Sequence, residues 1–300
     1  MKKTIVLHNP GAGEAETSKR DLIDLIEASG FNCSYSSTKQ SRWENLETDD
    51  VDFIVLAGGD GTVRKVAESL LDRRMTEKRF PLGLLPFGTA NNIAKTLGLP
   101  ESAHDIIKGW HGATMKKFDV GVIEGLAKPG FFLEGFGFGL FPKLMRAMEK
   151  EKKNDAADPK ERLESALILF HEILLSAPVK KCKLQLDDTD YSGEFILVEV
   201  MNTRSIGPNL VLAPDADAGD GEFDVVLITE KQRKHLAAYI QKKIDGEEVA
   251  FDFPLLKAKQ IIIEWDGKHA HVDDEYHKLE RSGCVKIQLR EGLLEFLVPS

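Results

Sequence analysis

Hydrophobic and polar positions follow two different periods in the first third of the chain. Strand-forming runs at 4–8, 31–38, 51–57 and 81–87 alternate with amphipathic stretches of helical spacing at 17–30, 62–72 and 89–98. Strict alternation of strand and helix predicts a parallel sheet with helices on both faces. Such sheets bind ligands beyond the carboxyl ends of their strands, which is where the loops at 8–13, 57–61 and 86–92 fall.

The pattern changes after about Phe118. Short β-like runs follow at 116–124, 130–139, 180–187, 193–202, 223–229, 260–275, 284–289 and 293–299, joined by turn signals such as DDTD and DAGDGE. Two helical stretches, 140–153 and 161–177, interrupt them. Many short strands with turns between them predict a second domain, a mainly antiparallel β-sandwich that begins near residue 123.

Composition narrows the class of protein. The 300 residues are 42% hydrophobic and 30% charged, as in globular proteins, and the formal net charge of -9 argues against a nucleic-acid partner. The longest apolar run, 131–141, is broken by Glu134 and glycines, and the apolar segment at the start is too short for a signal peptide. Three scattered cysteines fit reduced thiols. We therefore expect a cytoplasmic protein.

The turn Gly58-Gly59-Asp60-Gly61-Thr62 connects a buried strand to a helix. Backbone N–H groups and the positive end of the helix dipole meet there, and this combination binds phosphate. Glycine permits close approach to the main chain and also positive φ angles. Asp60 repels phosphate but suits the magnesium of a nucleotide, and Thr62 can cap the helix. Taken alone, each of these pairs also fits an ordinary tight turn.

Two further loops repeat this chemistry at the same edge. The stretch 86–92 offers Gly88, Thr89 and Asn91 before a helix, and Asn9 follows the first strand. We expect Thr38, at the end of the second strand, to contact the nucleotide as well. Three glycine-containing loops at one edge of one sheet predict a nucleotide-phosphate site.

These motifs resemble a known family. GGDGT at 58–62 is shared by diacylglycerol kinase-like lipid kinases, sphingosine kinases, NAD kinases and phosphofructokinases. NPGAG at 9–13, LLPFGTANNIAKTLGLP at 84–100 and the segment at 200–228 look specifically like the diacylglycerol kinase catalytic family. The resemblance implies a nucleotide-binding domain of residues 1–122 plus C-terminal strands at about 285–300, and a β-rich substrate and catalytic domain of residues 123–284. Asn92 departs from the family, which usually has aspartate there.

The resemblance also implies catalytic carboxylates near the C-terminus. The family has Asp-Gly-Glu there, with the glutamate suggested as the base. Two positions in this chain could match that motif. Asp266-Gly267 is followed by Lys268 and reads as a β-hairpin turn between two strands. Asp273 and Glu275, with Asp274 in place of glycine, fit better, and we predict Asp273, Glu275 and Asp60 as catalytic with Glu275 as the base. Taken alone, three adjacent acids also fit a solvated turn.

A second acidic loop holds Asp215, Asp217, Asp220 and Glu222. The resemblance implies a structural magnesium held by Asp217, Asp220 and the backbone carbonyl of Glu222, besides the magnesium at Asp60. A metal-free acidic turn fits the same residues equally well.

The resulting prediction is an ATP- and magnesium-dependent kinase that phosphorylates the hydroxyl of a lipid, with diacylglycerol or a related lipid favoured. A kinase of a sphingoid base or another small alcohol, and a nucleotide-binding regulator without catalysis, remain alternatives. The expected partners are the acceptor lipid and, transiently, a membrane surface, which makes a peripheral location at the membrane compatible with a cytoplasmic protein. A homodimer is among the assemblies left open.

Overall fold

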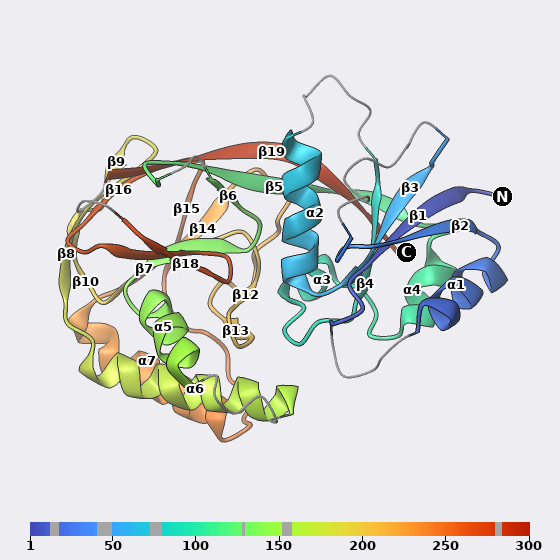
Figure 1. Cartoon of the computed structure of the whole chain (residues 1–300). Coiled ribbons are helices and arrows are strands. Elements are labelled where there is room, and N and C mark those ends of the chain that lie inside the picture. Colours follow the sequence, from blue (N-terminus) through green and yellow to red (C-terminus); the bar gives the residue numbers. More distant parts are fainter. Residues whose placement is uncertain (13–17, 41–49, 73–79, 128–129, 152–157, 280–283) are drawn as a thin grey trace. The chain divides into compact units, whose positions relative to one another are not determined.

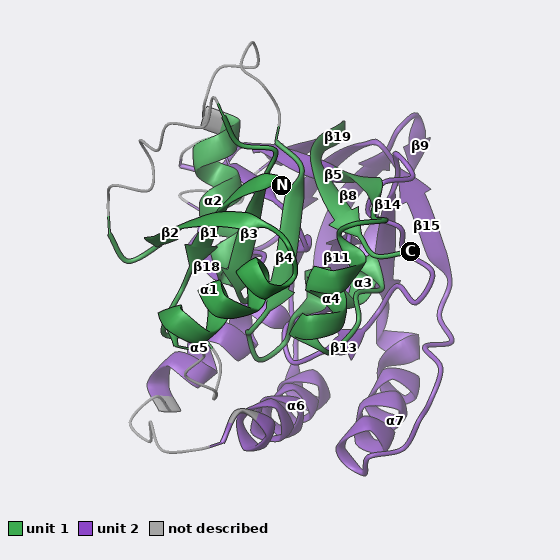
Figure 2. Cartoon of the chain, turned by 90° about the vertical axis from the view of Figure 1, so that its right-hand side faces the viewer, with its two compact units in different colours: residues 1–118, 291–300 green, residues 119–290 purple. Residues whose placement is uncertain are grey.

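The computed structural model describes residues 1–12, 18–40, 50–72, 80–127, 130–151, 158–279 and 284–300 (Figure 1). The chain divides into two compact units, which Figure 2 colours separately: residues 1–118 with 291–300, and residues 119–290. Strands β5 (Thr114–Glu124) and β19 (Cys284–Val298) each contribute residues to both units.

Unit 1 is built on a sheet in the order β19-β4-β3-β1-β2, whose neighbours all run parallel. Its elements are β1 (Lys3–His8), α1 (Lys19–Ala28), β2 (Asn32–Ser37), β3 (Phe53–Gly58), α2 (Asp60–Asp72), β4 (Leu82–Pro86), α3 (Asn92–Leu97) and α4 (Ala103–Gly109).

Both faces of the central strands in unit 1 are buried. Val55 of β3 packs with Leu22 of α1 and Ile106 of α4 in one hydrophobic cluster. Alternate β3 residues such as Leu56 point to the opposite face and are also buried, because α2 follows β3 and packs against it. The predicted parallel sheet with helices on both faces is confirmed.

The described residues of unit 2 form two large antiparallel sheets, a small two-stranded sheet at 205–206 and 210–211, and three α-helices. One sheet is ordered β15-β14-β11-β7-β17-β18, and the other contains the series β10-β8-β16-β19 with β9 paired to β8. The strands are β6 (Gly130–Phe132), β7 (Gly135–Phe138), β8 (Lys180–Leu186), β9 (Thr189–Asp190), β10 (Gly193–Phe195), β11 (Leu197–Met201), β12 (Ser205–Ile206), β13 (Leu210–Val211), β14 (Phe223–Ile228), β15 (Leu255–Ala258), β16 (Gln260–Trp265), β17 (His269–Val272) and β18 (Glu275–Lys278). The helices are α5 (Phe141–Glu151), α6 (Pro159–Ser176) and α7 (Arg233–Ile244), with a 3-10 turn at Glu230–Gln232.

The six-stranded sheet of unit 2 has a core on each face. Phe136 and Val198 lie in a cluster with Ile261 and Val285, which belong to the other sheet, so the two sheets form the predicted sandwich. On the opposite face, Leu197 lies in a cluster with Phe170 of α6. The second domain is therefore an antiparallel sandwich, as predicted, with a helical layer over one sheet.

The predicted hairpin around Asp266-Gly267 is wrong. Strand β16 pairs with β8 and β19, whereas β17 pairs with β7 and β18, so the 266–268 connection passes from one sheet to the other. The predicted strand at 193–202 likewise breaks at Ile196 into β10 and β11, which belong to different sheets. Local turn chemistry predicts that the chain bends but not which strand it pairs with afterwards.

Helices α4 and α7 and strand β15 were not predicted; α4 and β15 are only 7 and 4 residues long, too short for a clear period. Pairing of β15 with β14 in unit 2 is a long-range contact that no local pattern indicates. None of the described helices is long and apolar enough to span a membrane.

Candidate functional site

The predicted phosphate loops lie at one edge of the sheet in unit 1. Strands β1, β3 and β4 are parallel and adjacent, so their carboxyl ends at His8, Gly58 and Pro86 share an edge. The backbone N–H of Asn9 donates to the carbonyl of Ala57 at 2.9 Å, which ties the first loop to the end of β3.

The 58–61 and 86–91 loops touch through bare backbone. A Cβ atom built on Gly88 would lie 2.4 Å from the Cα of Gly59, and one on Gly59 would lie 2.8 Å from the Cα of Gly88. Gly58 faces the side chain of Thr62, whose Oγ1 would be 2.4 Å from an added Cβ. None of these glycines has a positive φ, contrary to the expectation from the sequence. Close approach, not backbone strain, therefore requires glycine here.

Asn91 holds its own loop in shape. Its Nδ2 donates to the carbonyls of Gly88 and Pro86 at 2.7 and 3.1 Å, and its Oδ1 accepts from the N–H of Gly88 at 2.9 Å. The residue adopts the left-handed conformation, φ 52°, which asparagine tolerates. The amide is thus engaged within the loop, and the exposed residue of the group is Thr89.

Asp60 links two helix N-termini. It is the first residue of α2, and its two carboxylate oxygens accept the N–H groups of Asn92 and Ile93 at 2.9 and 3.1 Å, at the start of α3. Lys95, one turn further, has a pKa lowered by burial, an effect that the carboxylate of Asp60 opposes. A carboxylate has about four acceptor positions, so these bonds are compatible with the predicted magnesium at Asp60.

The remaining predicted residues of unit 1 also support the loops. The helix begins at Asp60 rather than after Thr62, so Thr62 is not the cap that we predicted; its Oγ1 accepts from Nδ2 of Asn9 at 3.3 Å. Gly61 is exposed in the same first turn. Thr38 is buried, its N–H donates to the carbonyl of His8 at 2.9 Å, and its own carbonyl accepts from Nζ of Lys65 at 2.7 Å.

In unit 2, Asp273 and Asp274 form the two-residue turn of the β17–β18 hairpin, in which Val272 pairs with Glu275. Asp273 is only 2% exposed and has a φ of 51°. Its Oδ1 accepts the N–H groups of Leu133, Glu134 and Gly135 at 3.1, 2.8 and 3.1 Å. Asp273, predicted as a catalytic carboxylate, is therefore saturated by backbone donors and anchors the turn.

Glu275 differs from Asp273 in every respect that matters for a base. It is exposed and begins strand β18. Its Oε2 lies 3.5 Å from Nε2 of His277, two residues along the same strand. The competing residue Asp266 is exposed in the connection between sheets, 3.8 Å from Nζ of Lys180. Of the two candidate positions for the Asp-Gly-Glu motif, the one with Glu275 places an exposed carboxylate directly after an anchored turn.

A lysine meets two carboxylates of the acidic loop at 215–224. Nζ of Lys257 lies 2.7 Å from Oδ2 of Asp220 and 3.8 Å from Oε2 of Glu222. Oδ1 of Asp220 accepts the N–H of Glu222 at 3.0 Å, and Oδ1 of Asp217 accepts the N–H of Gly219 at 3.1 Å. Among the described residues, no three His, Cys, Asp or Glu side chains converge as metal ligands. The predicted structural magnesium does not fit this arrangement, because an ammonium group already meets the carboxylate of Asp220.

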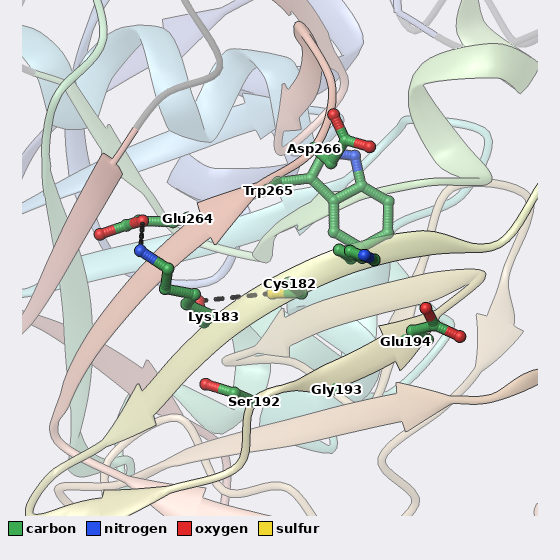
Figure 3. Close-up of a pocket in the computed structure, with 9 residues that line it drawn as sticks. Cys182, Lys183, Ser192, Gly193, Glu194, Glu264, Trp265 and Asp266 are labelled. Atoms are coloured by element: carbon green, nitrogen blue, oxygen red, sulfur yellow. Dashed lines mark hydrogen bonds and ion pairs between the residues drawn. The ribbon is translucent and has the colours of Figure 1, made fainter.

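Unit 2 also has an open depression of about 530 Å³ between β8, β10 and β16 (Figure 3). Lys183 and Glu264 form an ion pair of 2.7 Å at its side, and Trp265 is almost fully buried beneath it. Burial, and secondarily Glu264, raises the pKa of Cys182 to about 12, so this thiol is not a nucleophile. The lining contains neither Asp273 nor Glu275, and its charged rim does not suit an acyl chain.

Two side chains that the sequence analysis did not single out meet inside unit 2. His271 and Glu199 are both 0% exposed, and Nε2 of the histidine lies 2.8 Å from Oε1 of the glutamate. Glu199 stands alone in the apolar run 195–201, and an acid in such a run is a usable signal, because buried charges need partners.

The parallel sheet with phosphate-type loops at one edge, together with an antiparallel sandwich that carries an exposed carboxylate, defines a two-domain kinase fold. Residues 3–123 match the family model for the diacylglycerol kinase catalytic domain, and residues 145–280 match that for the YegS C-terminal NAD kinase beta sandwich-like domain. The chain belongs to the diacylglycerol kinase-like family and is a kinase that phosphorylates an alcohol group.

Diacylglycerol kinases are among the relatives with similar sequences. The chain is 28% identical over 258 residues to a diacylglycerol kinase of Bacillus subtilis, a match that covers 80% of this chain and 77% of the relative. It is 26% identical over 235 residues to a diacylglycerol kinase of Mycobacterium tuberculosis, covering 75% and 71%. A diacylglycerol kinase structure from Bacillus anthracis superposes with a TM-score of 0.73 at 24% identity, over 99% of this chain and 96% of that one, which shows the shared fold.

Proposed function

We propose that this kinase transfers the γ-phosphoryl group of ATP to the hydroxyl of a diacylglycerol or a closely related lipid. The observation that carries the nucleotide part is the backbone contact between Gly59 and Gly88, which places two loops together at the N-terminus of α2. That terminus presents the positive end of a helix dipole to an anion. Bare backbone at two adjacent loops suits a polyphosphate, whose oxygens accept main-chain N–H groups.

The lipid part of the proposal rests on the relatives, whose names specify diacylglycerol. A diacylglycerol resides in a membrane, so a transient contact with a membrane surface is part of the proposal. A cytoplasmic location stays a prediction from the sequence.

Glu275 is the proposed general base. Phosphoryl transfer to an alcohol needs a group that orients the hydroxyl and accepts its proton, and an exposed carboxylate on a short, anchored hairpin meets that need. Asp60 is the proposed residue for holding the magnesium that accompanies ATP. Magnesium, when bound, would neutralise charge on the transferring phosphoryl group. Asn9, Thr62 and Asn91 shape the loops around that site.

The direct test is ATP turnover with purified protein against mixed micelles that contain one acceptor each: a 1,2-diacylglycerol, a monoacylglycerol, a ceramide or a sphingoid base. We expect phosphorylated product with diacylglycerol and little with the others. ADP release without any phosphorylated lipid would refute the lipid-kinase proposal, and a preference for the sphingoid base would change the acceptor.

The base is tested by Glu275→Gln, with Glu194→Gln as the matched control. Glu194 is an exposed glutamate on β10 of the same unit. Loss of a general base lowers the rate by roughly 10²–10⁴-fold, so Glu275→Gln should lose turnover by that factor and retain ATP binding. Normal turnover of Glu275→Gln would exclude Glu275 as the base.

A further inference from the structure

Glu199, Gly137 and His271 form one row across three neighbouring strands. In the six-stranded sheet, Gly137 of β7 is the register partner of Glu199 on β11 and of His271 on β17. A Cβ atom on Gly137 would lie 2.1 Å from Oε2 of Glu199. The central strand therefore leaves the space in which the two flanking side chains meet. The ring of Phe141, from α5, covers His271 at a centroid distance of 5.4 Å.

Hydrogen-bond directions assign one shared proton to this pair. Nδ1 of His271 faces the backbone carbonyl of Asp273 at 2.9 Å and must donate to it. Nε2 faces both carboxylate oxygens of Glu199, at 2.8 and 3.0 Å, so a proton lies between the two side chains. An isolated ion is costly to bury, and breaking one partner of a buried pair leaves the other uncompensated. The pair consequently acts as a single rigid unit.

The rigid unit is connected to the hairpin turn. His271 donates to the carbonyl of Asp273, whose N–H in turn donates to the carbonyl of Gly135 at 2.8 Å. The carboxylate of Asp273 gathers the N–H groups of residues 133–135. Asp273 has a positive φ, which aspartate adopts more readily than most residues in a hairpin turn, and its hydrogen bonds fix that conformation. Glu275 follows two residues later, at the end of this series of bonds.

We propose that Glu199 and His271 are positioning residues for the reaction: they hold the 273–274 turn so that Glu275 is presented in one orientation. The inference rests on the proposed role of Glu275 as the base. Neither Glu199 nor His271 touches substrate, since both are fully buried. Their effect on catalysis passes through the turn, because His271 donates to the carbonyl of Asp273.

The test is Glu199→Gln, which keeps the volume of the side chain and removes its charge, with Glu194→Gln as the control. Misplacement of a catalytic group by about 1 Å can cost on the order of 10²-fold in rate. We expect kcat to fall by about 10-fold to 10²-fold, while the KM for ATP stays unchanged because the nucleotide loops belong to unit 1. Thermal unfolding recorded by circular dichroism establishes that the variant is folded at the assay temperature.

A double-mutant cycle with Glu275→Gln separates positioning from general loss of structure. If the pair acts through Glu275, adding Glu199→Gln to Glu275→Gln should leave the residual turnover unchanged. A further loss equal to that in the wild-type background would show a merely structural role. An unchanged kcat in Glu199→Gln alone would also overturn the inference, whereas an active Glu275→Gln would instead refute the proposed base.

A second variant guards against misfolding. Glu199→Gln/His271→Gln replaces the ion pair by two amides, which can hydrogen-bond to each other without a buried charge. If Glu199→Gln alone does not fold, the double variant should fold and show the same fall in kcat with an unchanged KM for ATP. A double variant with wild-type kcat would overturn the inference.

Discussion

Asp273→Asn tests the anchoring of the hairpin turn. The carboxylate is 2% exposed and accepts three backbone N–H groups through Oδ1, so it has no contact with solvent that could replace them. Asparagine keeps the size and one acceptor oxygen, but its amide group presents hydrogens in place of the second oxygen, which lies 3.1 Å from the N–H of Leu133. We therefore expect the hydrogen bonds to lose the contribution of the negative charge. In addition, the side-chain NH₂ group of asparagine would face the N–H of Leu133, so that two donors oppose each other.

The magnitude follows from those contacts. A hydrogen bond to a charged group contributes about 1.5–3 kcal/mol, and a buried donor left unsatisfied costs about 1–3 kcal/mol. Asp273→Asn should therefore lower the free energy of unfolding by about 2–4 kcal/mol. For units of this size, that corresponds to a fall in Tm of roughly 5–15 °C.

The assay is thermal and urea unfolding followed by circular dichroism, with Asp274→Asn as the control. Asp274 is the other residue of the turn and is exposed, so its substitution should change the free energy of unfolding by less than about 0.5 kcal/mol. If Asp273→Asn unfolds like the wild type but is inactive, the anchoring argument is refuted, and Asp273 is a catalytic residue in the direct sense.

Three further predictions concern the phosphate loops, the acidic loop and the buried pair. Gly88→Ala places a Cβ 2.4 Å from the Cα of Gly59, so ATP affinity should fall at least tenfold in a titration; Gly112→Ala, which meets only Ser300 at 3.5 Å, should bind normally. Lys257→Met should lower stability by about 0.5–1 kcal/mol in low salt, and EDTA should not change the Tm of the wild type; a Tm that falls with EDTA and recovers with Mg²⁺ would show a metal at the acidic loop. Burial lowers the pKa of His271, but Glu199 and the hydrogen bonds outweigh it and raise the pKa above 6.5. The stability from this group is thus complete below pH 6.5 and is lost as the pH rises through the raised pKa; urea unfolding between pH 6 and 9 should show that decline in the wild type and not in Glu199→Gln/His271→Gln.

Local patterns in the chain were sufficient for the fold class of each unit and for placing the predicted phosphate loops at one edge of a sheet. The apolar run at 53–57 and the amphipathic stretch at 62–72 indicate a buried strand and its helix, since burial on two faces and on one face leave different periods. The glycines at 58, 59 and 88 identify backbone that a ligand or another loop approaches closely. In the structure, Gly59 and Gly88 let two loops touch backbone to backbone, and none of the three glycines has a positive φ. Both facts depend on which loop lies opposite, which the local pattern does not show.

Long-range partners could not be inferred in the same way. Asp273 and Glu275 look alike in the sequence, yet one is buried under three backbone donors from residues 133–135 and the other is exposed. Likewise, Lys257 meets Asp220, and His271 meets Glu199 across the strand that contains Gly137. These contacts join residues that are 37 to 140 positions apart. Strand order and register bring them together, and both are set by packing of the whole sheet rather than by the residues next to each group.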